Sequence, residues 1–315
     1  MNNQNLPPAI FLMGPTASGK TGLAVDIYSK LPVELISVDS ALVFRDMDIG
    51  TAKPDAATLA KAPHHLIDII SPTEAYSAAN FRNDALRLMA DITARGKTPV
   101  LVGGTMLYFK ALEGGLSHLP EANPEVREEI EQEAAQIGWP AMHQKLAEID
   151  PESAARLQPA DAQRIERALE VYRITGKTMT ALHQESSGAA LPYRLLKIAL
   201  LPSDRKVLHQ RIALRFDAML TDGFLDEVKA LLTKYPALTA ESTAMRCVGY
   251  RQALAHLAGE YDVAELRDRG IFATRQLAKR QLTWLRSMDA LAEVDCLNDA
   301  MPEIVRDKIA RFINL

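Results

Sequence analysis

Apolar residues along this chain fall into short uninterrupted runs, and segments with the spacing of amphipathic helices lie between them. Uninterrupted apolar runs of strand length are typical of buried parallel strands. One helix is expected after the first run, ending near Leu31, and another at residues 81–95. The strand-like runs are residues 9–13, 34–38, 99–102 and 195–201. This alternation of strands and helices predicts an α/β fold, a parallel sheet flanked by helices.

The strand pattern stops between residues 119 and 192. Short charged helices are predicted there instead, and prolines separate them at positions 120, 124, 140, 151 and 159. We interpret residues 119–192 as a helical insertion that is closed by the loop Ser186-Ser187-Gly188. The core domain would then consist of residues 1–118 and 193–315, with helices filling most of the chain after residue 201.

The composition of the 315 residues is that of a globular protein, with 48% hydrophobic and 24% charged residues. Residues 1–8 lack the charged start and apolar run of a secretory signal, and no stretch reaches the roughly 18 apolar residues of a membrane span. We expect a cytoplasmic protein without membrane contact, and a monomer. Cys247 and Cys296 fit neither C-x-x-C nor C-x-x-H spacing, so we expect both to be reduced.

Charge is distributed unevenly, although the formal net charge is only −4. Residues 113–152 contain ten acidic and two basic residues, whereas residues 246–286 contain eight basic and four acidic ones. Local imbalance of this kind matters more for nucleic-acid binding than the total charge does. The basic segment could therefore form a surface that accepts a polyanion.

The sequence Gly14-Pro15-Thr16-Ala17-Ser18-Gly19-Lys20-Thr21 fits the phosphate-binding loop pattern G-x-x-x-x-G-K-[ST]. It follows the first strand-like run and opens a helix, as this motif requires. Glycines let backbone N–H groups turn toward phosphate oxygens, and the helix offers its positive N-terminus. Lys20 adds a charge, and Thr21 has the hydroxyl that usually ligates Mg²⁺. The chain is therefore predicted to bind a phosphorylated ligand.

This loop alone leaves kinases, GTPases and motor ATPases open. The N-K-x-D motif that reads guanine does not occur in the sequence, which argues against a GTPase. Asp39, at the end of the second predicted strand, is the candidate carboxylate, whereas a kinase more often has a later aspartate and an arginine-rich lid. Arg211 and Arg215 share one face of a predicted helix, and two guanidiniums suit a diphosphate. A surface pair of Arg215 with Asp217 is the alternative.

The adjacent histidines His64 and His65, with Asp68, invite a metal-binding interpretation. Neighbouring side chains point in different directions, however, and no third ligand is evident from the spacing. We favour a hydrogen-bonded structural role for both imidazoles.

The stretch DSALVFRDMDIGTAKP at residues 39–54 closely resembles the signature of the tRNA dimethylallyltransferases. Further motifs similar to those of this family are HHLID at 64–68, YSA at 76–78, GGTMLY at 103–108, RCVGYRQ at 246–252, TRQLAKRQ at 274–281 and WLR at 284–286. The resemblance covers the chain from Gly14 to Arg286. Leu42 and Phe44 depart from it, because many members carry glutamine and tyrosine at these positions.

The resemblance implies a P-loop NTPase-like fold and a reaction. The family transfers a dimethylallyl group from dimethylallyl diphosphate to N6 of adenosine 37 of tRNA, next to the anticodon. The leaving group is then the diphosphate, whose charge Lys20, the loop amides and a Thr21-bound Mg²⁺ could neutralise. By resemblance, Asp39 is the base that assists the adenine amine, and Arg215 binds the diphosphate.

The family resemblance also implies contacts with the anticodon stem-loop of tRNA. Arg246, Tyr250, Arg251 and Gln252 would supply cations, an aromatic face and an amide, which suit an unstacked RNA loop. Without the resemblance, the basic helix near residue 280 would be interpreted as a solvated face. The full set implied to contact tRNA is Asp39, Ser40, Ala41, Leu42, Thr105, Arg127, Gln163, Arg164, Ile165, Glu166, Arg167, Arg246, Cys247, Val248, Gly249, Tyr250, Arg251, Gln252, Arg275, Lys279, Arg280 and Arg286.

Alternative functions remain open at this point. An adenylate isopentenyltransferase would act on free nucleotides and would need neither the basic C-terminal third nor the insertion. A P-loop small-molecule kinase would transfer a phosphoryl group instead. An RNA-binding protein without enzymatic activity would keep the arginines but has no use for Lys20, Thr21 and Asp39 together.

Overall fold

A computed structural model describes residues 6–115, 119–185 and 191–314. The chain divides into one unit made of Met1–Leu112 and Pro192–Leu315, and a second unit made of Glu113–Leu191. The division predicted at residues 119 and 192 thus lies six residues from the first of these boundaries and one from the second. The predicted loop Ser186-Ser187-Gly188 lies outside the described residues.

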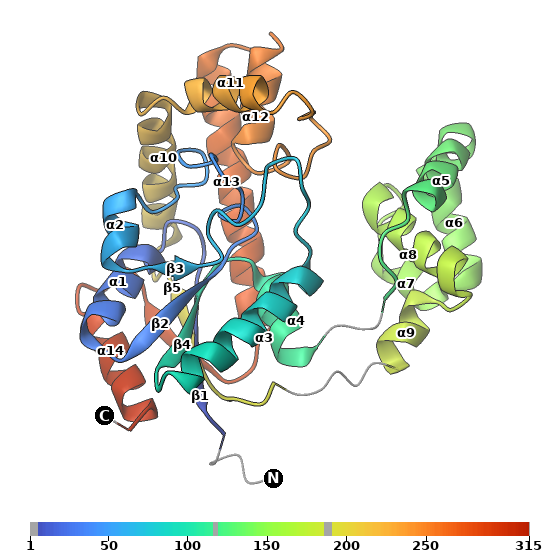
Figure 1. The fold of residues 1–315 in the computed structure, drawn as a ribbon. Helices are drawn as coiled ribbons and strands as arrows, with labels where there is room; N and C mark the ends of the chain where they lie inside the picture. The colour runs from blue at the N-terminus through green and yellow to red at the C-terminus, as the bar shows by residue number, and fades with distance from the viewer. Residues whose placement is uncertain (1–5, 116–118, 186–190, 315) are drawn as a thin grey trace. The chain divides into compact units, whose positions relative to one another are not determined.

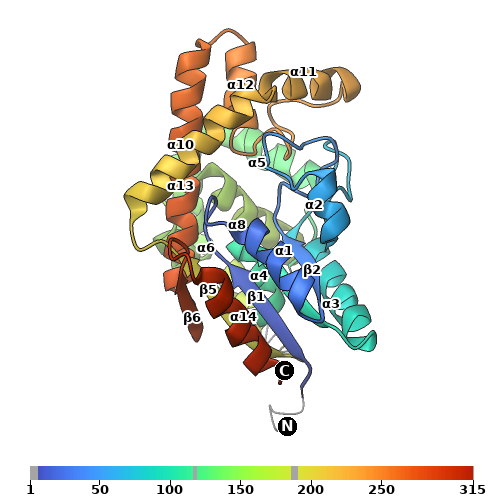
Figure 2. The same ribbon diagram turned by 90° about the vertical axis from the view of Figure 1, so that its left-hand side faces the viewer.

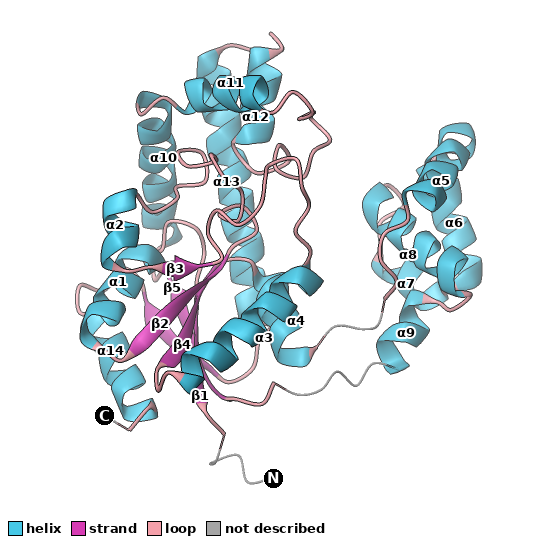
Figure 3. Ribbon diagram, in the orientation of Figure 1, coloured by secondary structure: helices cyan, strands magenta, loops and turns pink. Residues whose placement is uncertain are grey.

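The larger unit is built on a six-stranded sheet with the order β3-β2-β4-β1-β5-β6 (Figure 1 labels β1 to β5, and Figure 2 labels β6). Every neighbouring pair of strands is parallel. The strands are β1 (Pro8–Met13), β2 (Val33–Val38), β3 (His64–His65), β4 (Thr98–Gly103), β5 (Arg194–Leu201) and β6 (Leu291–Asp295). Helices cover both faces of the sheet (Figure 3), which explains why the central strands are uninterrupted apolar runs. The predicted α/β fold with a parallel sheet is confirmed.

The sequence pattern located four of these strands to within about one residue and missed the two edge strands. β3 contains only His64 and His65. The His64 ring bonds to the carbonyl of Ala62, and the His65 ring bonds to Glu34, so both have the hydrogen-bonded structural role that was expected. β6 has the sequence LAEVD and is mostly half-buried or exposed, so it has no uninterrupted apolar run that could have revealed it.

Side chains alternate between the two faces of β1. Ile10 and Leu12 pack in a cluster with α1 (Lys20–Lys30) and α14 (Met301–Phe312), which lie together on one face of the sheet (Figure 2). Phe11 points to the other face, where its ring lies 5.0 Å from that of Phe109 in α4 (Met106–Gly114). This period of two is the geometry of an extended strand. The helix α3 (Ala78–Ala94) also packs against β4 and β2.

A second hydrophobic core joins the C-terminal helices to the segment that follows β2. It contains Phe44, Phe216, Phe224 and Tyr250, all of which are buried. A Cβ at Gly270 would overlap the ring of Phe216, so the glycine allows close packing of α10 (Arg205–Thr221) against α13 (Val263–Arg286). The remaining helices of this unit are α2 (Ala56–Lys61), α11 (Phe224–Lys234) and α12 (Tyr250–Leu257).

The smaller unit is helical. Its helices are α5 (Pro124–Ile137), α6 (Trp139–Ile149), α7 (Pro151–Arg156), α8 (Ala162–Thr175) and α9 (Met179–Glu185). Pro124, Pro140 and Pro151 occupy the first turns of α5, α6 and α7, where the missing N–H has no intrahelical partner to lose. Among the described residues, no helix combines the length and the apolar character needed to cross a bilayer.

Candidate active site at the carboxyl edge of the sheet

The carboxyl ends of β1, β2 and β4 lie side by side, and the segments that follow them meet there. Open parallel sheets bind ligands at this edge. The loop after β1 begins at Gly14, and Asp39 directly follows β2. After β4, the N–H of Thr105 bonds to the Val38 carbonyl at 3.2 Å. A Cβ at Gly103 would overlap that same carbonyl, so a glycine is required here.

The phosphate-binding loop has the conformation that its sequence predicts. Gly19 is the N-cap of α1 with φ 84°, and no side chain caps the helix. The N–H groups of the first turn therefore point into the loop without a side-chain acceptor, and the helix dipole adds positive potential. A Cβ at Gly14 would lie 2.8 Å from Ser18 Oγ, because the loop closes on itself. This geometry forms a cradle for an anion.

Lys20 lies inside this loop. Its Nζ donates hydrogen bonds to the carbonyls of Gly14 at 2.8 Å and Pro15 at 2.6 Å. Burial lowers the pKa of Lys20 to about 8, the nearby Asp39 opposes this shift, and Arg215 adds to it. A bound phosphate would favour the charged ammonium that burial disfavours.

Arg215 reaches the same loop from α10. Its guanidinium donates a hydrogen bond to the Thr16 hydroxyl. Burial lowers the pKa of Arg215 and the charge of Asp39 raises it, so the guanidinium is desolvated at the loop. The suggested surface pair with Asp217 does not form, since Asp217 pairs with Arg267. Arg211 bonds instead to the carbonyl of Cys296 at 3.4 Å.

Asp39 is held by its own turn. Its Oδ1 accepts hydrogen bonds from the N–H groups of Ala41 at 2.8 Å and Leu42 at 3.3 Å. Its Oδ2 has no hydrogen bond to any described residue. Ser40 extends the turn, since its N–H bonds to Thr105 Oγ1 at 3.1 Å. The arrangement fixes the carboxylate and leaves one oxygen available to a ligand.

Asp39 is also the electrostatic centre of the site. Its charge acts on Lys20, Arg215, Tyr108 and Cys247. Burial, helped by this charge, raises the pKa of Cys247 to about 12, so its thiol stays protonated. Burial and Asp39 raise the pKa of Tyr108 as well. Two cations and one carboxylate are therefore the charged groups that remain for chemistry here.

Thr21 is exposed in the first turn of α1, directly after Lys20. Among the described residues, no group of three or more histidine, cysteine, aspartate or glutamate side chains could hold a metal ion. A Mg²⁺ ion would suit such a site, because it binds through few protein ligands and keeps phosphate oxygens and waters as the others. The Thr21 hydroxyl and a bound diphosphate provide ligands of that kind.

Gln281 is a residue of the site that sequence reasoning did not single out. Its Oε1 accepts a hydrogen bond from the Thr16 N–H at 2.8 Å, and its Nε2 donates to the Gly104 carbonyl at 2.9 Å. The buried amide thus links α13 to two loops of the sheet edge. A Cβ at Gly104 would overlap it. The available signal was a glutamine on the buried stripe formed by Thr274, Ala278 and Leu285.

The segment 246–252 divides into exposed and buried residues. Arg246 and Arg251 are exposed, and Arg246 forms an ion pair with Glu241. Gln252 Oε1 accepts a hydrogen bond from the N–H of Gly249 at 2.8 Å and so caps α12. Val248 and Cys247 are half-buried, and Gly249 is buried. Only part of this segment can therefore present side chains to RNA.

Tyr250 requires a correction, because its ring is fully buried and cannot stack on a base. The ring packs edge-on against Phe224 at 5.1 Å, and its hydroxyl donates to Glu227 Oε1 at 2.5 Å. The Glu227 carboxylate also accepts hydrogen bonds from the N–H groups of Asp48, Ile49 and Gly50. Tyr250 and Glu227 thus hold the loop that follows β2.

The other predicted tRNA contacts of the larger unit lie on α13. Lys279, Arg280 and Arg286 are exposed, and Arg275 is half-buried. None of these four cations has an ion pair within the described ranges 6–115, 119–185 and 191–314. They remain candidates for RNA contact.

In the smaller unit, Glu170 is fully buried and accepts hydrogen bonds from two of the three predicted arginines, Arg127 and Arg167. Arg127 donates to it at 2.8 and 3.1 Å, and Arg167 donates at 2.5 Å. Although burial opposes it, these bonds hold the pKa of Glu170 below its usual value. The structure therefore gives Arg127 and Arg167 an internal partner, which the prediction of tRNA contact did not include.

The neighbours of Arg167 on α8 differ in exposure. Ile165 is fully buried in the core of the unit, so its side chain packs there and is not available to RNA, contrary to the prediction. Gln163 and Arg164 are exposed, and Arg164 forms an ion pair with Asp161 at 2.8 Å. Glu166 is half-buried.

Comparison with known sequences shows similarity over nearly the whole chain. The family described as IPP transferase matches residues 42–288. A tRNA dimethylallyltransferase of Methylobacillus flagellatus is 66% identical over 308 residues, which cover 98% of each chain. Another, from Dechloromonas aromatica, is 58% identical over 314 residues and the full length of both chains.

Solved structures show the same similarity in three dimensions. The tRNA isopentenylpyrophosphate transferase of Bacillus halodurans is similar with a TM-score of 0.72 and 35% identity, covering 98% of this chain and 97% of that one. A eukaryotic dimethylallyltransferase, captured acting on tRNA, has a TM-score of 0.79 and 26% identity, covering 96% of this chain and 78% of its own.

Proposed function

The chain belongs to the IPP transferase family, and we propose that it transfers a dimethylallyl group from dimethylallyl diphosphate to N6 of adenosine 37 of tRNA. The relatives from Methylobacillus flagellatus and Dechloromonas aromatica are named tRNA dimethylallyltransferase. The similar eukaryotic dimethylallyltransferase was captured acting on tRNA. A single structural observation carries the chemistry. The phosphate-binding loop, two desolvated cations and a fixed carboxylate meet at one edge of the sheet.

The cations serve the leaving group. Negative charge grows on the diphosphate as the bond between its oxygen and the allylic carbon breaks, and positioned donors stabilise that charge best. The N–H groups of the first turn of α1, Lys20 Nζ and the Arg215 guanidinium are such donors. Mg²⁺ held by Thr21 would neutralise further charge on the diphosphate when it is bound.

The carboxylate serves the nucleophile. The exocyclic amine of adenine is weakly nucleophilic, and a base that takes its proton assists the attack. Asp39 Oδ2 is the available oxygen, since Ala41 and Leu42 occupy Oδ1. The bond between N6 and the allylic carbon forms, the carbon–oxygen bond breaks, and the amine proton passes to Asp39. The products are N6-(dimethylallyl)adenosine and diphosphate.

The target adenine must leave the stack of the anticodon loop to reach this edge. Enzymes that modify a base generally extrude it and hold it in a pocket. We also propose that a monomer carries out the reaction in the cytoplasm, because one chain contributes every group named above and the proposed substrate is tRNA.

The test is transfer of label. Unmodified tRNA, Mg²⁺ and dimethylallyl diphosphate labelled in the prenyl group are incubated with the protein, and we expect label in the RNA at position 37. A tRNA with guanosine at position 37 is the matched control and should stay unlabelled. Label on free AMP but not on tRNA would indicate an adenylate isopentenyltransferase, and phosphoryl transfer from ATP without prenyl transfer would indicate a kinase.

A further inference from the structure

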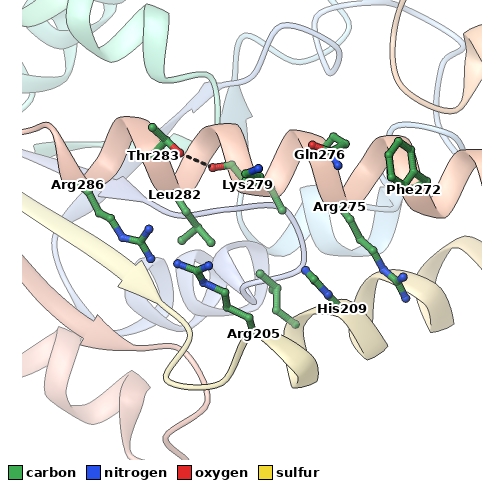
Figure 4. Close-up of a pocket in the computed structure, with 11 residues that line it drawn as sticks. Arg205, His209, Phe272, Arg275, Gln276, Lys279, Leu282, Thr283 and Arg286 are labelled. Atoms are coloured by element: carbon green, nitrogen blue, oxygen red, sulfur yellow. Dashed lines mark hydrogen bonds between the residues drawn. The ribbon is translucent and has the colours of Figure 1, made fainter.

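A pocket of about 350 Å³ lies between α10 and α13. Its charged lining consists of Arg205 from α10 and Arg275, Lys279 and Arg286 from α13, and His209 adds an imidazole (Figure 4). No aspartate or glutamate is among the residues that line it. Four permanent cations thus surround one small space with no carboxylate to balance them.

Charge pairing on α13 changes along the helix. Near its start, Arg267 pairs with Asp217 and Arg269 pairs with Glu265. The pocket cations have no ion pair to any residue that the structure describes. The Arg275 Nε is also buried without a hydrogen-bond partner. A buried donor without an acceptor is unfavourable, so this end of the helix is organised for an acceptor that the chain itself does not supply.

The pocket faces away from the phosphate-binding loop. Successive residues of an α-helix are rotated by about 100°, so Arg275, Lys279 and Arg286 fall within about 40° of one another. Gln281, which bonds to the loop at Thr16, is rotated by about 200° from Lys279. An anion in the pocket is therefore separate from the diphosphate at Lys20.

We propose that the pocket binds phosphodiester groups of the tRNA backbone at a distance from the reacting adenosine, and that Arg205 and His209 complete the site from α10. This inference rests on the proposed function, because tRNA is the polyanion that this function provides. Figure 4 shows the guanidiniums of Arg205 and Arg286 extending toward each other across the pocket. Two such groups repel unless an anion lies between them, and guanidiniums bind phosphate oxygens in pairs.

The proposal extends the RNA-binding surface to a second helix. Sequence reasoning placed RNA contacts on α13 but none on α10. Phosphate contacts contribute affinity that does not depend on base identity and that weakens with salt. The pocket should therefore set the strength of tRNA binding rather than the choice of adenosine.

The experiment measures the dissociation constant of full-length unmodified tRNA against salt for wild type and Arg205→Ala. We expect Arg205→Ala to weaken binding about threefold to tenfold at moderate salt, and to lower the slope of log K against log salt by roughly 0.7 to 0.9. Arg205→Lys should keep most of the slope, because it retains the charge. Arg87→Ala is the matched control, since Arg87 is an exposed arginine on α3 that pairs with Asp84 outside the pocket.

The affinity for dimethylallyl diphosphate should stay as in wild type for Arg205→Ala, because the pocket is separate from Lys20. An unchanged salt slope for Arg205→Ala and for the charge reversal Arg205→Glu would overturn the proposal. So would binding of inorganic phosphate that depends on Arg205 while tRNA binding does not. Failure of wild type to label tRNA would instead refute the proposed function, so the two failures are distinguishable.

Discussion

Two regions of this molecule differ in the partners that they provide for their buried or partly buried cations. At the sheet edge, Lys20 bonds to the carbonyls of Gly14 and Pro15, and Arg215 bonds to the Thr16 hydroxyl, all of which are uncharged acceptors. In the helical insertion, Arg127 and Arg167 both bond to the carboxylate of buried Glu170. In the first region neither cation forms an ion pair with a described residue, although the charge of Asp39 acts on both, whereas in the second region both arginines form ion pairs with one buried carboxylate.

This difference separates a ligand site from a structural one. A desolvated cation that forms no ion pair is unfavourable until an anion binds, so its removal should cost activity and little stability. A buried carboxylate that holds two guanidiniums is already satisfied, so its removal should cost stability and leave the chemistry at the other region intact. Both expectations can be tested on the same protein.

The largest effect is expected at the sheet edge. Lys20→Ala should lower the rate of prenyl transfer about 10³-fold, and Lys20→Ala combined with Arg215→Ala about 10⁴-fold or more, because both groups stabilise the leaving diphosphate. Thr21→Ala should also nearly abolish transfer if its hydroxyl holds Mg²⁺. Single-turnover assays with saturating tRNA measure this loss.

The Lys20 variants should retain the stability and the tRNA affinity of wild type. Burial lowers the pKa of Lys20, so the folded state disfavours its charged form, and the free energy of unfolding should not fall when Lys20 is removed. tRNA affinity should remain close to that of wild type. Near-normal turnover of Lys20→Ala at saturating dimethylallyl diphosphate would show that the loop is not the diphosphate site.

The next largest effect is expected for Asp39→Asn. The amide can still accept one hydrogen bond, but it cannot take the proton of the adenine amine, so the rate should fall about 10²- to 10⁴-fold. Binding of both substrates should weaken far less. Single-turnover rates on preformed enzyme–tRNA complexes measure the difference.

The alternative for Asp39 is a role in ordering Mg²⁺. In that case raising the Mg²⁺ concentration should restore part of the rate of Asp39→Asn, and the affinity for dimethylallyl diphosphate should fall together with the rate. A rate within a fewfold of wild type would exclude Asp39 as the base.

Glu170→Gln tests whether the ion pairs of the helical insertion contribute to stability. It leaves the guanidiniums of Arg127 and Arg167 without their counter-charge, and loss of one partner of a buried ion pair costs about 3 kcal/mol of the free energy of unfolding. Urea unfolding followed by limited proteolysis of the insertion measures this loss. Glu128→Gln, on the exposed face of α5, is the matched control and should stay near wild type.

Glu170→Gln should also leave the affinity for dimethylallyl diphosphate unchanged. If the variant instead keeps wild-type stability and only weakens tRNA binding, then the main role of Arg127 and Arg167 is to bind RNA and not to stabilise the insertion.

Sequence patterns were sufficient for features that depend on neighbouring residues. Buried parallel strands are uninterrupted apolar runs, so β1 and β4 could be located, and the glycines and lysine of the phosphate-binding loop act within eight positions. Asp39 was identifiable because it follows a strand, and strand ends meet at one edge of a parallel sheet.

Features that depend on distant residues could not be predicted in the same way. Gln281 contacts Thr16 across 265 positions, and Glu227 holds the backbone of Asp48 across 179. Neither partner carries a local pattern that indicates the other. The burial of Tyr250 and of Ile165 likewise depends on neighbours supplied by other elements.

Gln281→Ala is expected to have a smaller effect than the variants above. It removes the acceptor of the Thr16 N–H and the donor to the Gly104 carbonyl, so the loop should be less well positioned. We expect kcat/KM for dimethylallyl diphosphate to fall about 10- to 100-fold. Gln281→Glu keeps the acceptor for Thr16 but places a negative charge near the diphosphate, so it should weaken binding of that substrate further.

Gln276→Ala is the matched control, because Gln276 lies on the opposite side of the same helix. An equal loss in both variants would mean that the glutamines act through helix stability alone. Thermal unfolding of the two variants measures that contribution directly.

The smallest effect expected is a pH dependence of dimethylallyl diphosphate affinity. The pKa of Lys20 in the free protein is about 8, and a bound diphosphate must raise it because the anion favours the ammonium. Below pH 8 the ammonium is already present and affinity should be flat. Above pH 8 binding must take up a proton, so affinity should fall by up to tenfold per pH unit until the pKa of the complex is reached.

Lys20→Arg separates this dependence from other titrations. A guanidinium stays charged throughout this pH range, so the variant should bind with a pH-independent affinity, although its different shape should weaken binding. Phosphate groups with a pKa near 6 are already ionised, and burial keeps the pKa of the Cys247 thiol at about 12, outside the range. Isothermal titration between pH 7 and pH 9 gives both affinity and proton uptake. The same fall in Lys20→Arg would assign the dependence to a group other than Lys20, and the cation at the sheet edge would then be permanently charged like those of the insertion.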